Sequence, residues 1–359
     1  MLTGESHIIA IVAIVALGCG EKRKEHAAVP VASVAGLSAV PADVQVLVGI
    51  QVPRIKGLFA GALRNAWSQA VFPDIERIAQ NMRTLGHCVD FGRDVDETLV
   101  AIGQPAQGEV LVVLRGKLDE ARSMDCLRAL ASQRGSRLET RDLAGATAHH
   151  VSRGEDGGIG SGTWFTVGGP GTLLVSLSES YLSRARDPKA RKASNRSEIM
   201  EIVSRVDRQK GAWCVGFLPQ EVGKALSSIT QGAIKHAAST FWGSLDISDG
   251  LALDISLDMA DDADATALVD FARRQLPSIS LMAHGAGMSG LFANHDIGFA
   301  GDTVHFSLRL SALELAKLEE RLSERPFVSP QSEWIGDGGP GAPPAPHDKY
   351  AQEKEGAPL

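Results

Sequence analysis

The sequence predicts an α+β protein with two tandem repeats, each a largely antiparallel sheet covered by helices, and a disordered C-terminal tail rich in proline and glycine. Three observations predict this fold. Short apolar runs of high β propensity are bounded by turn residues, amphipathic stretches with a helical period lie between them, and both halves repeat the same order of elements. The length of 359 residues suits about two domains, and 44% hydrophobic residues suffice for a buried core.

The first repeat covers residues 41–183. A β-rich run that Pro53 closes is followed by a helix, two strands, a second helix, a hairpin and a short helix. The predicted elements are Val44–Val52, a helical face with Ile55, Leu58, Phe59 and Leu63, then Thr98–Gly103, Glu109–Arg115, Leu118–Gln133, Thr163–Val167, Thr172–Leu177 and Ser178–Leu182. The string Val-Gly-Ile shortly before the proline reappears in the other half as Val-Gly-Phe.

The second repeat covers residues 211–325 and follows the same order, with Pro219 after its first strand. Asp249-Gly250 lies between two alternating apolar runs, which is the strongest short-range signal for a β-hairpin. The predicted elements are Ala212–Leu218, a helical face with Val222, Leu226 and Ile229, then Ser244–Ile247, Leu251–Met259, Ala263–Gln275, Ala293–Phe299, Thr303–Leu310 and Ser311–Arg321.

The remaining segments are predicted to be connectors. Residues 20–40 are charged and then rich in Ala, Val and Ser, which indicates a tether, and residues 326–359 have the proline and glycine content of a disordered tail. Residues 184–210 form a linker with a short helix around Ser197–Val206. This linker carries nine Lys/Arg against four Asp/Glu, which indicates either a basic docking face or an ordinary solvated surface.

The N-terminus has the pattern of an export signal. Ten consecutive apolar residues, Ile8–Leu17, precede Gly18-Cys19-Gly20, and they are too few to span a bilayer as a helix. The residues before Ile8 include no Lys or Arg, whereas a signal peptide normally begins with positive charge. An uncleaved apolar stub is therefore the alternative.

Ala16-Leu17-Gly18-Cys19 resembles the lipobox of bacterial lipoprotein signal peptides, although Ala16 stands where that family more often has Leu. The resemblance implies a signal peptide at residues 1–19 and acyl chains on Cys19 that anchor the protein to a membrane. The opening Ala42–Ile50 loosely resembles that of uncharacterised, duplicated exported lipoproteins. This second resemblance implies no catalytic residues.

Three cysteines remain after Cys19. In an oxidising compartment Cys88 and Cys126 can form one disulfide, with Cys214 left as a buried free thiol; three unpaired thiols are the alternative. The spacing of the cysteines and histidines does not match a zinc site, so we expect no metal and no cofactor.

Composition and motifs exclude several function classes. The net charge of -7 and only 18 aromatic residues argue against nucleic-acid binding. His284–Gly290 places a serine, Ser289, in a glycine-rich run, but Leu291 breaks the pattern of a nucleophile elbow. His149 and His150 are expected on opposite faces of a strand, where they cannot share one ion.

Two further motifs have structural interpretations. The acidic cluster of Asp258, Asp261, Asp262 and Asp264 lacks the order of a calcium loop, and Asp261 or Asp262 is expected to cap the following helix. Gly168–Gly171 lacks the context of a phosphate loop and predicts a turn between two strands.

The sequence thus predicts a non-enzymatic lipoprotein of the bacterial cell envelope, anchored to a membrane through Cys19, with its body in the periplasm or at the cell surface and a scaffold or partner-binding role. One alternative is a module that binds an apolar small molecule between the repeats, because pockets favour such interfaces. Another is a weak serine hydrolase that uses Ser289.

Overall fold

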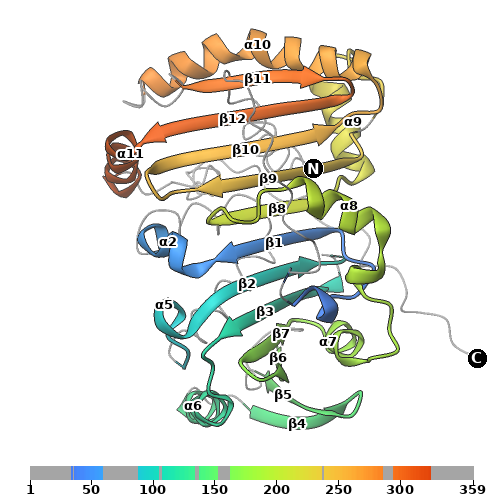
Figure 1. Ribbon diagram of the computed structural model, residues 1–359, viewed down its shortest axis with the longest axis vertical. Helices are drawn as coiled ribbons and strands as arrows, with labels where there is room; N and C mark the ends of the chain where they lie inside the picture. Colours follow the sequence, from blue (N-terminus) through green and yellow to red (C-terminus); the bar gives the residue numbers. More distant parts are fainter. Residues whose placement is uncertain are drawn as a thin grey trace, which may run out of the picture.

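The computed structural model describes Val34 and residues 36–59, 88–104, 107–133, 137–152, 162–236, 238–285 and 294–324. In these ranges twelve strands form one antiparallel sheet with helices packed on its faces, so the predicted α+β class is confirmed (Figure 1). None of the helices in the same ranges combines the length and the apolar character that crossing a membrane requires.

The elements have the following bounds. The strands are β1 Val46–Gln51, β2 Val95–Ile102, β3 Val110–Gly116, β4 Arg137–Leu143, β5 Ala146–Ser152, β6 Thr163–Gly169, β7 Thr172–Ser176, β8 Ala212–Phe217, β9 Thr240–Asp246, β10 Gly250–Asp258, β11 His295–Ala300 and β12 Thr303–Ser311. The helices are η2 Leu37–Ala39, α2 Val52–Phe59, α5 Phe91–Asp94, α6 Glu120–Gln133, α7 Glu179–Arg186, η4 Ala193–Asn195, α8 Ser197–Arg205, α9 Gln220–Ile229, α10 Asp262–Gly285 and α11 Ala312–Glu324.

The strand order is the same in both directions from the centre of the sheet. The first half runs outward as β1, β2, β3, β7 and β6, and the second half as β8, β9, β10, β12 and β11. The hairpin β4–β5 extends the first half by two strands. The halves join where β1 pairs with β8, with Val46 opposite Gly216 and Ile50 opposite Ala212, so the two predicted sheets are one continuous sheet.

Packing at this junction explains why the shared Val-Gly string carries a glycine. Gly49 of β1 lies opposite Trp213 of β8, and a Cβ atom at Gly49 would lie 2.1 Å from the indole ring. The indole is 2% exposed and belongs to a buried cluster with Leu47 and Val215. A side chain at position 49 would therefore push the two halves apart.

The first half of the sheet is covered on both faces. One face packs against η2, η4, α7 and α8 through a cluster that includes Leu111, Val113 and Ile202. The other face packs against α2, α5 and α6 through a cluster that includes Val112, Leu114 and Met124. Because neighbouring residues of β3 point to opposite faces, its whole run Val110–Leu114 is buried.

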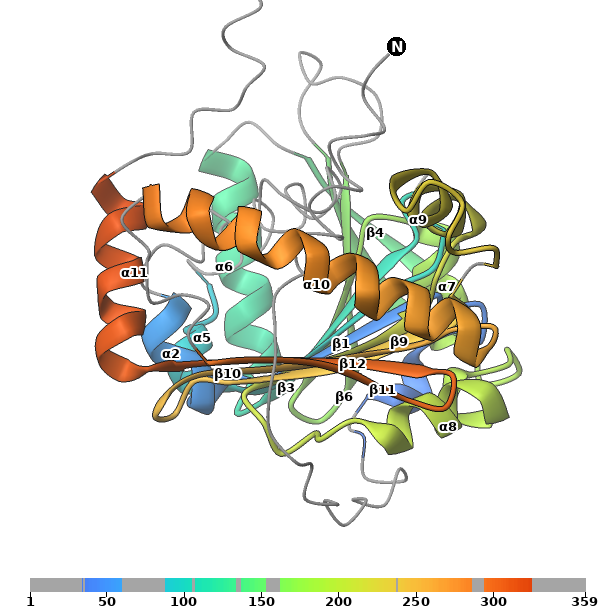
Figure 2. The same cartoon turned by 90° about the horizontal axis from the view of Figure 1, so that it is seen from above.

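The second half is covered on one face. Leu257, Val304 and Phe306 pack against α9 and α10, and Figure 2 shows α10 and α11 on the same side of the sheet. The opposite face of β10, β11 and β12, which we call the open face, contributes no residue to the hydrophobic clusters of the described chain. The strand register gathers on it Ala252, Asp254, Asp296, Ser307 and Arg309.

Most predicted elements are present, and the turn Ser248–Gly250 joins β9 and β10 as predicted. One helix is longer than predicted: α10 continues through Pro277 to Gly285, whereas the sequence placed its end at Gln275. An interior proline costs about 3 kcal/mol, and burial of Leu276 and Ala283 on either side offsets that cost. The strand β4 was not predicted, because its sequence RLETRDL is charged and largely exposed.

The predicted tether and linker are corrected in part. Val34, Leu37 and Val40 are at most 8% exposed and join the core, so the tether does not extend to residue 40. The segment pairs with the linker, where the Ala193 N–H donates to the Val40 carbonyl over 2.9 Å. The linker is folded because the apolar face of α8, including Val203, is buried against the sheet. The predicted tail, residues 326–359, lies outside the described residues.

Candidate functional site: a cavity in the first half

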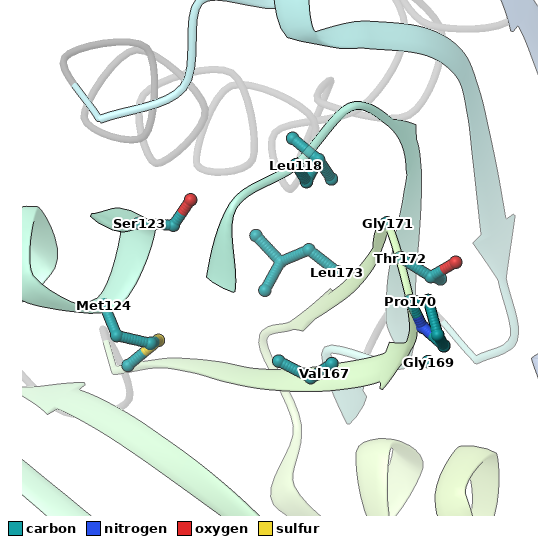
Figure 3. A pocket seen from close by; sticks show the side chains of 9 residues that line it. All are labelled: Leu118, Ser123, Met124, Val167, Gly169, Pro170, Gly171, Thr172 and Leu173. Carbon is teal, nitrogen blue, oxygen red and sulfur yellow. The ribbon is translucent and has the colours of Figure 1, made fainter. Parts of the chain in front are cut away.

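A cavity of about 270 Å³ lies in the first half, between the start of α6 and the turn of the β6–β7 hairpin (Figure 3). From the α6 side it is lined by Leu118, Ser123 and Met124. The hairpin supplies the other wall with Val167, Gly169, Pro170, Gly171, Thr172 and Leu173. Its volume is near the lower end of the range for small-molecule sites, roughly 300–1,000 Å³.

Local structure holds both walls in place. The Asp119 carboxylate accepts a hydrogen bond from the Arg122 N–H over 3.0 Å, which caps the start of α6. On the hairpin side, the N–H of Gly116 at the end of β3 donates to the carbonyl of Gly171 over 3.0 Å. Gly171 has a φ of 64°, a left-handed conformation that glycine adopts without strain. The turn predicted at Gly168–Gly171 is therefore present, and its residues line the cavity.

The lining defines what the cavity can bind. Leu118, Met124 and Leu173 present hydrocarbon and thioether surface, and Ser123 adds a hydroxyl from a residue that is 6% exposed. None of the lining residues is charged. Polar atoms of the lining expose nearly as much surface as apolar ones. The cavity therefore suits an uncharged molecule with both kinds of group and disfavours an ion, because burying an unpaired charge is costly.

A disulfide ties α6 to the segment before α5. Cys126 of α6 is bonded to Cys88, with their Cα atoms 5.4 Å apart. The bond lies two residues beyond Met124, so it holds the helical wall of the cavity against the first half of the molecule. Cys214 is a free thiol in β8, and its burial raises its pKa to about 11, which keeps it protonated and unreactive at neutral pH.

The adjacent histidines lie on opposite faces of β5, as the alternation of a strand predicts. His149 Nδ1 lies 3.3 Å from the Thr140 hydroxyl, whereas the His150 ring stacks on Trp164 with centroids 4.3 Å apart. The guanidinium carbon of Arg141 lies over the Trp164 ring, 5.4 Å from its centroid. Burial lowers the pKa of His150, so its imidazole is neutral at physiological pH.

The carboxylates of the acidic cluster accept hydrogen bonds that stabilise the fold. Asp261 accepts a hydrogen bond from the Asp264 N–H over 2.8 Å and caps α10, as predicted. Asp264 itself is 2% exposed and accepts hydrogen bonds from the backbone N–H groups of Lys235 and His236. Although burial raises the pKa of Asp264, these hydrogen bonds outweigh it and hold the pKa below its ordinary value.

The sequence did not indicate His236, which completes a cluster with Asp261 and Asp264. Its Nδ1 lies 2.9 Å from the Asp264 carboxylate and 3.6 Å from that of Asp261. Three potential ligand atoms within 4.8 Å of one another could hold a metal ion. The hydrogen bonds of Asp264 already account for this arrangement, since they pin residues 235–236 to the start of α10.

Several cations of the linker have partners within the protein. Arg184 bridges Asp43 and Glu109, and Arg205 bridges Glu201 and Asp258. Lys192 donates to the carbonyls of Arg184 and Ala185. The ion pairs neutralise part of the charge that the sequence places in this segment. The structure therefore favours the interpretation of the linker as an ordinary surface over a basic docking face.

Comparisons with known proteins do not assign the chain to a family. No protein-family model matches the chain, and no curated protein sequence matches it. The similar solved structures include three crystal forms of TP0453. Form I has a TM-score of 0.39 at 12% identity, with 81% of this chain and 98% of that chain covered. Form III has a TM-score of 0.41 at 12% identity, with 81% and 99% covered, and form IV has 0.38 at 14%, with 80% and 97% covered.

Some predicted positions lie outside the described residues, namely Cys19 and Ser289. His284 lies near the C-terminal end of α10 and is exposed. The cavity was not predicted, because its lining residues come from two segments that lie far apart in the sequence and share no local pattern. The available signals were the Gly-Pro-Gly turn and a serine, Ser123, between apolar residues of a helix.

Proposed function

We propose that this protein is a non-enzymatic lipoprotein of the bacterial cell envelope, held at a membrane by acyl chains on Cys19 and serving as a scaffold or partner-binding body. Two acyl groups provide stable anchoring, whereas a single chain binds a membrane only marginally. The residues between Cys19 and the first buried residue, Val34, would form the tether.

The observation that carries this proposal is the disulfide between Cys88 and Cys126. Disulfides persist in the periplasm and outside the cell and are rare in the cytosol, where thiols are kept reduced. The disulfide is independent of the N-terminal motif, because it lies in the folded body. The bond and the lipobox resemblance at Ala16–Cys19 therefore support the same compartment from different parts of the chain.

For the partner-binding role we propose the open face of β10, β11 and β12. Antiparallel sheets often keep one face solvated, and this one carries charged and hydroxyl groups. Arg309 and Asp254 form an ion pair of 2.8 Å on it, with side chains 47% and 41% exposed. A partner bound here would be polar, because the residues of this face present hydrogen-bonding groups.

We also propose that the two halves are copies of one ancestral unit. Equivalent hydrogen bonds support it: Asp119 caps α6 as Asp261 caps α10, and Ser178 caps α7 as Ser311 caps α11. The repeats would meet directly at the β1–β8 pair. The C-terminal residues 326–359 would be a disordered tail, as their proline and glycine content indicates.

The deciding experiment compares the wild type with Cys19→Ser in a bacterial host. Membranes and soluble fractions are separated, and the intact mass of the mature N-terminus is recorded. We expect wild type in the membrane fraction with a diacylglyceryl group on Cys19, and the variant outside it. Full-length chains of both proteins in the cytoplasm, with free thiols at Cys88 and Cys126, would overturn the proposal.

The two alternative functions have weaker support. At the junction of the halves, described residues of β1, β8 and α8 line a cavity of about 10 Å³, roughly enough for one water molecule. This cavity is too small for an apolar ligand. The hydrolase alternative depends on Ser289, and unchanged ester turnover in Ser289→Ala would eliminate it.

A further inference from the structure

The cavity beside α6 is a local difference between two otherwise corresponding regions. In the second half the same place lies between α10 and the β11–β12 hairpin. The strand register makes the positions comparable, because Arg115 pairs with Thr172 at the end of β3 as Asp258 pairs with Thr303 at the end of β10. Ser123 and Ala265 are likewise each four residues after the capping aspartate.

The residue that follows Arg115 differs from the residue that follows Asp258. Met259 follows β10, donates its N–H to the Asp302 carbonyl over 2.9 Å, and belongs to the buried cluster with Leu268 and Val304. Its counterpart is Gly116, which makes the equivalent hydrogen bond to the Gly171 carbonyl. The chain thus supplies a buried thioether side chain in the second half and no side chain at the same position in the first.

The first half cannot simply acquire such a side chain. The Asp94 carbonyl lies where a Cβ atom of Gly116 would be, at 2.1 Å from it. The backbone at the end of α5 therefore excludes a side chain at this position. Two residues further along the chain, Leu118 lines the cavity together with Leu173. The cavity is partly open to solvent, and its volume of about 270 Å³ is near the lower end of the range for small-molecule sites, roughly 300–1,000 Å³.

From this geometry we infer that the cavity between α6 and the β6–β7 turn is a binding site for a small, uncharged molecule that carries both apolar and hydrogen-bonding groups. The ligand contacts Leu118 and Met124 from the helix side and Val167 and Leu173 from the hairpin side. The Ser123 hydroxyl offers one hydrogen bond. The site lies in the first half and is separate from the open face proposed for a polar partner.

The test uses N-phenyl-1-naphthylamine, an uncharged fluorophore that brightens in apolar surroundings. The full chain carrying Cys19→Ser is purified without detergent, so that neither acyl chains nor detergent compete for the cavity. We expect saturable binding of one probe per chain. Because the measurement needs no anchor, its failure would leave the lipoprotein proposal standing, and failure of that proposal would leave this measurement meaningful.

Two substitutions fill the cavity from opposite walls. Ser123→Leu adds a side chain from the helix and Val167→Phe adds one from the hairpin, and each is expected to weaken probe binding at least tenfold. Ala121→Leu is the matched control, because Ala121 is exposed on the same helix, and its affinity should stay within twofold of wild type. Circular dichroism and the thermal midpoint verify that each variant is folded.

The outcomes separate clearly. The proposal is supported if the parent chain and the control bind the probe saturably and both filling substitutions abolish this binding. Absence of saturable binding to the parent chain overturns the proposal. Equal binding by the folded filling variants also overturns it, because the probe would then occupy another apolar surface.

Discussion

The two halves share a strand order but differ in how many faces of the sheet are buried. In β3 of the first half the run Val110–Leu114 is apolar at every position, whereas its counterpart in the second half, β10, alternates apolar and polar residues from Leu253 to Asp258. The first pattern belongs to a strand covered on both faces and the second to a strand with one solvated face. The same strand order is therefore compatible with a sheet that is buried on both faces in one half and solvated on one face in the other.

The helices explain this difference. The segment η2, the helix η4 and the helix α8 all pack on the face of the sheet centred on β1, β2 and β8. Their apolar residues reach as far as Trp242 of β9, where Arg205 of α8 lies 5.0 Å from the indole ring. Beyond β9 the face becomes polar, so the helical cover and the sequence pattern of the strands change together.

The largest effect is expected from removing the disulfide, which belongs to the first half. The double variant Cys88→Ser, Cys126→Ser releases a crosslink between residues 38 positions apart. In the chain-entropy model this costs roughly 4 kcal/mol of unfolding free energy. Guanidinium denaturation of oxidised wild type and the variant measures it. Cys214→Ser, which removes the free thiol, is the control for losing a cysteine, and an equal loss in both would contradict the assignment.

A smaller effect is expected from placing an amide on corresponding faces of the two halves. Val113→Asn buries a polar group at a position that is 1% exposed and should cost about 3 kcal/mol. Ser307→Asn places the same group on the open face and should stay within about 0.5 kcal/mol of wild type. Denaturation midpoints compare the two. Similar losses would show that the open face is buried in solution and would break the comparison between the halves.

The smallest effect is a pH dependence in the first half. Burial lowers the pKa of His150 in the folded protein, so the unfolded chain takes up a proton at a higher pH than the folded protein does. Stability is therefore unaffected above the ordinary histidine pKa of about 6.5 and falls as the pH drops below it. His150→Gln should reduce the loss of stability between pH 7 and pH 5. His149→Gln, on the opposite face of β5, is the control, and an equal change in both variants would contradict the prediction.

The sequence predicted the elements better than their assembly. The Asp-Gly hairpin, the aspartate cap at the start of α10 and the matching order of elements are local features, and each follows from a few neighbouring residues. The charged strand β4 and the passage of α10 through Pro277 were missed. In both, contacts with distant residues override a local preference, because β4 pairs with β5 and α10 packs on the sheet.

The sequence by itself determined the fold class, the hydrophobic and polar faces of the strands, and the cysteines available for a disulfide. Only the tertiary structure decided that β1 and β8 join the halves into one sheet, that residues from Val34 onward belong to the core, and that a cavity opens beside Leu118. The physical reason is the distance along the chain between the residues that interact. Periodicity and capping depend on residues within a few positions, whereas pairing across the centre and incomplete filling beside a helix depend on segments far apart in the chain.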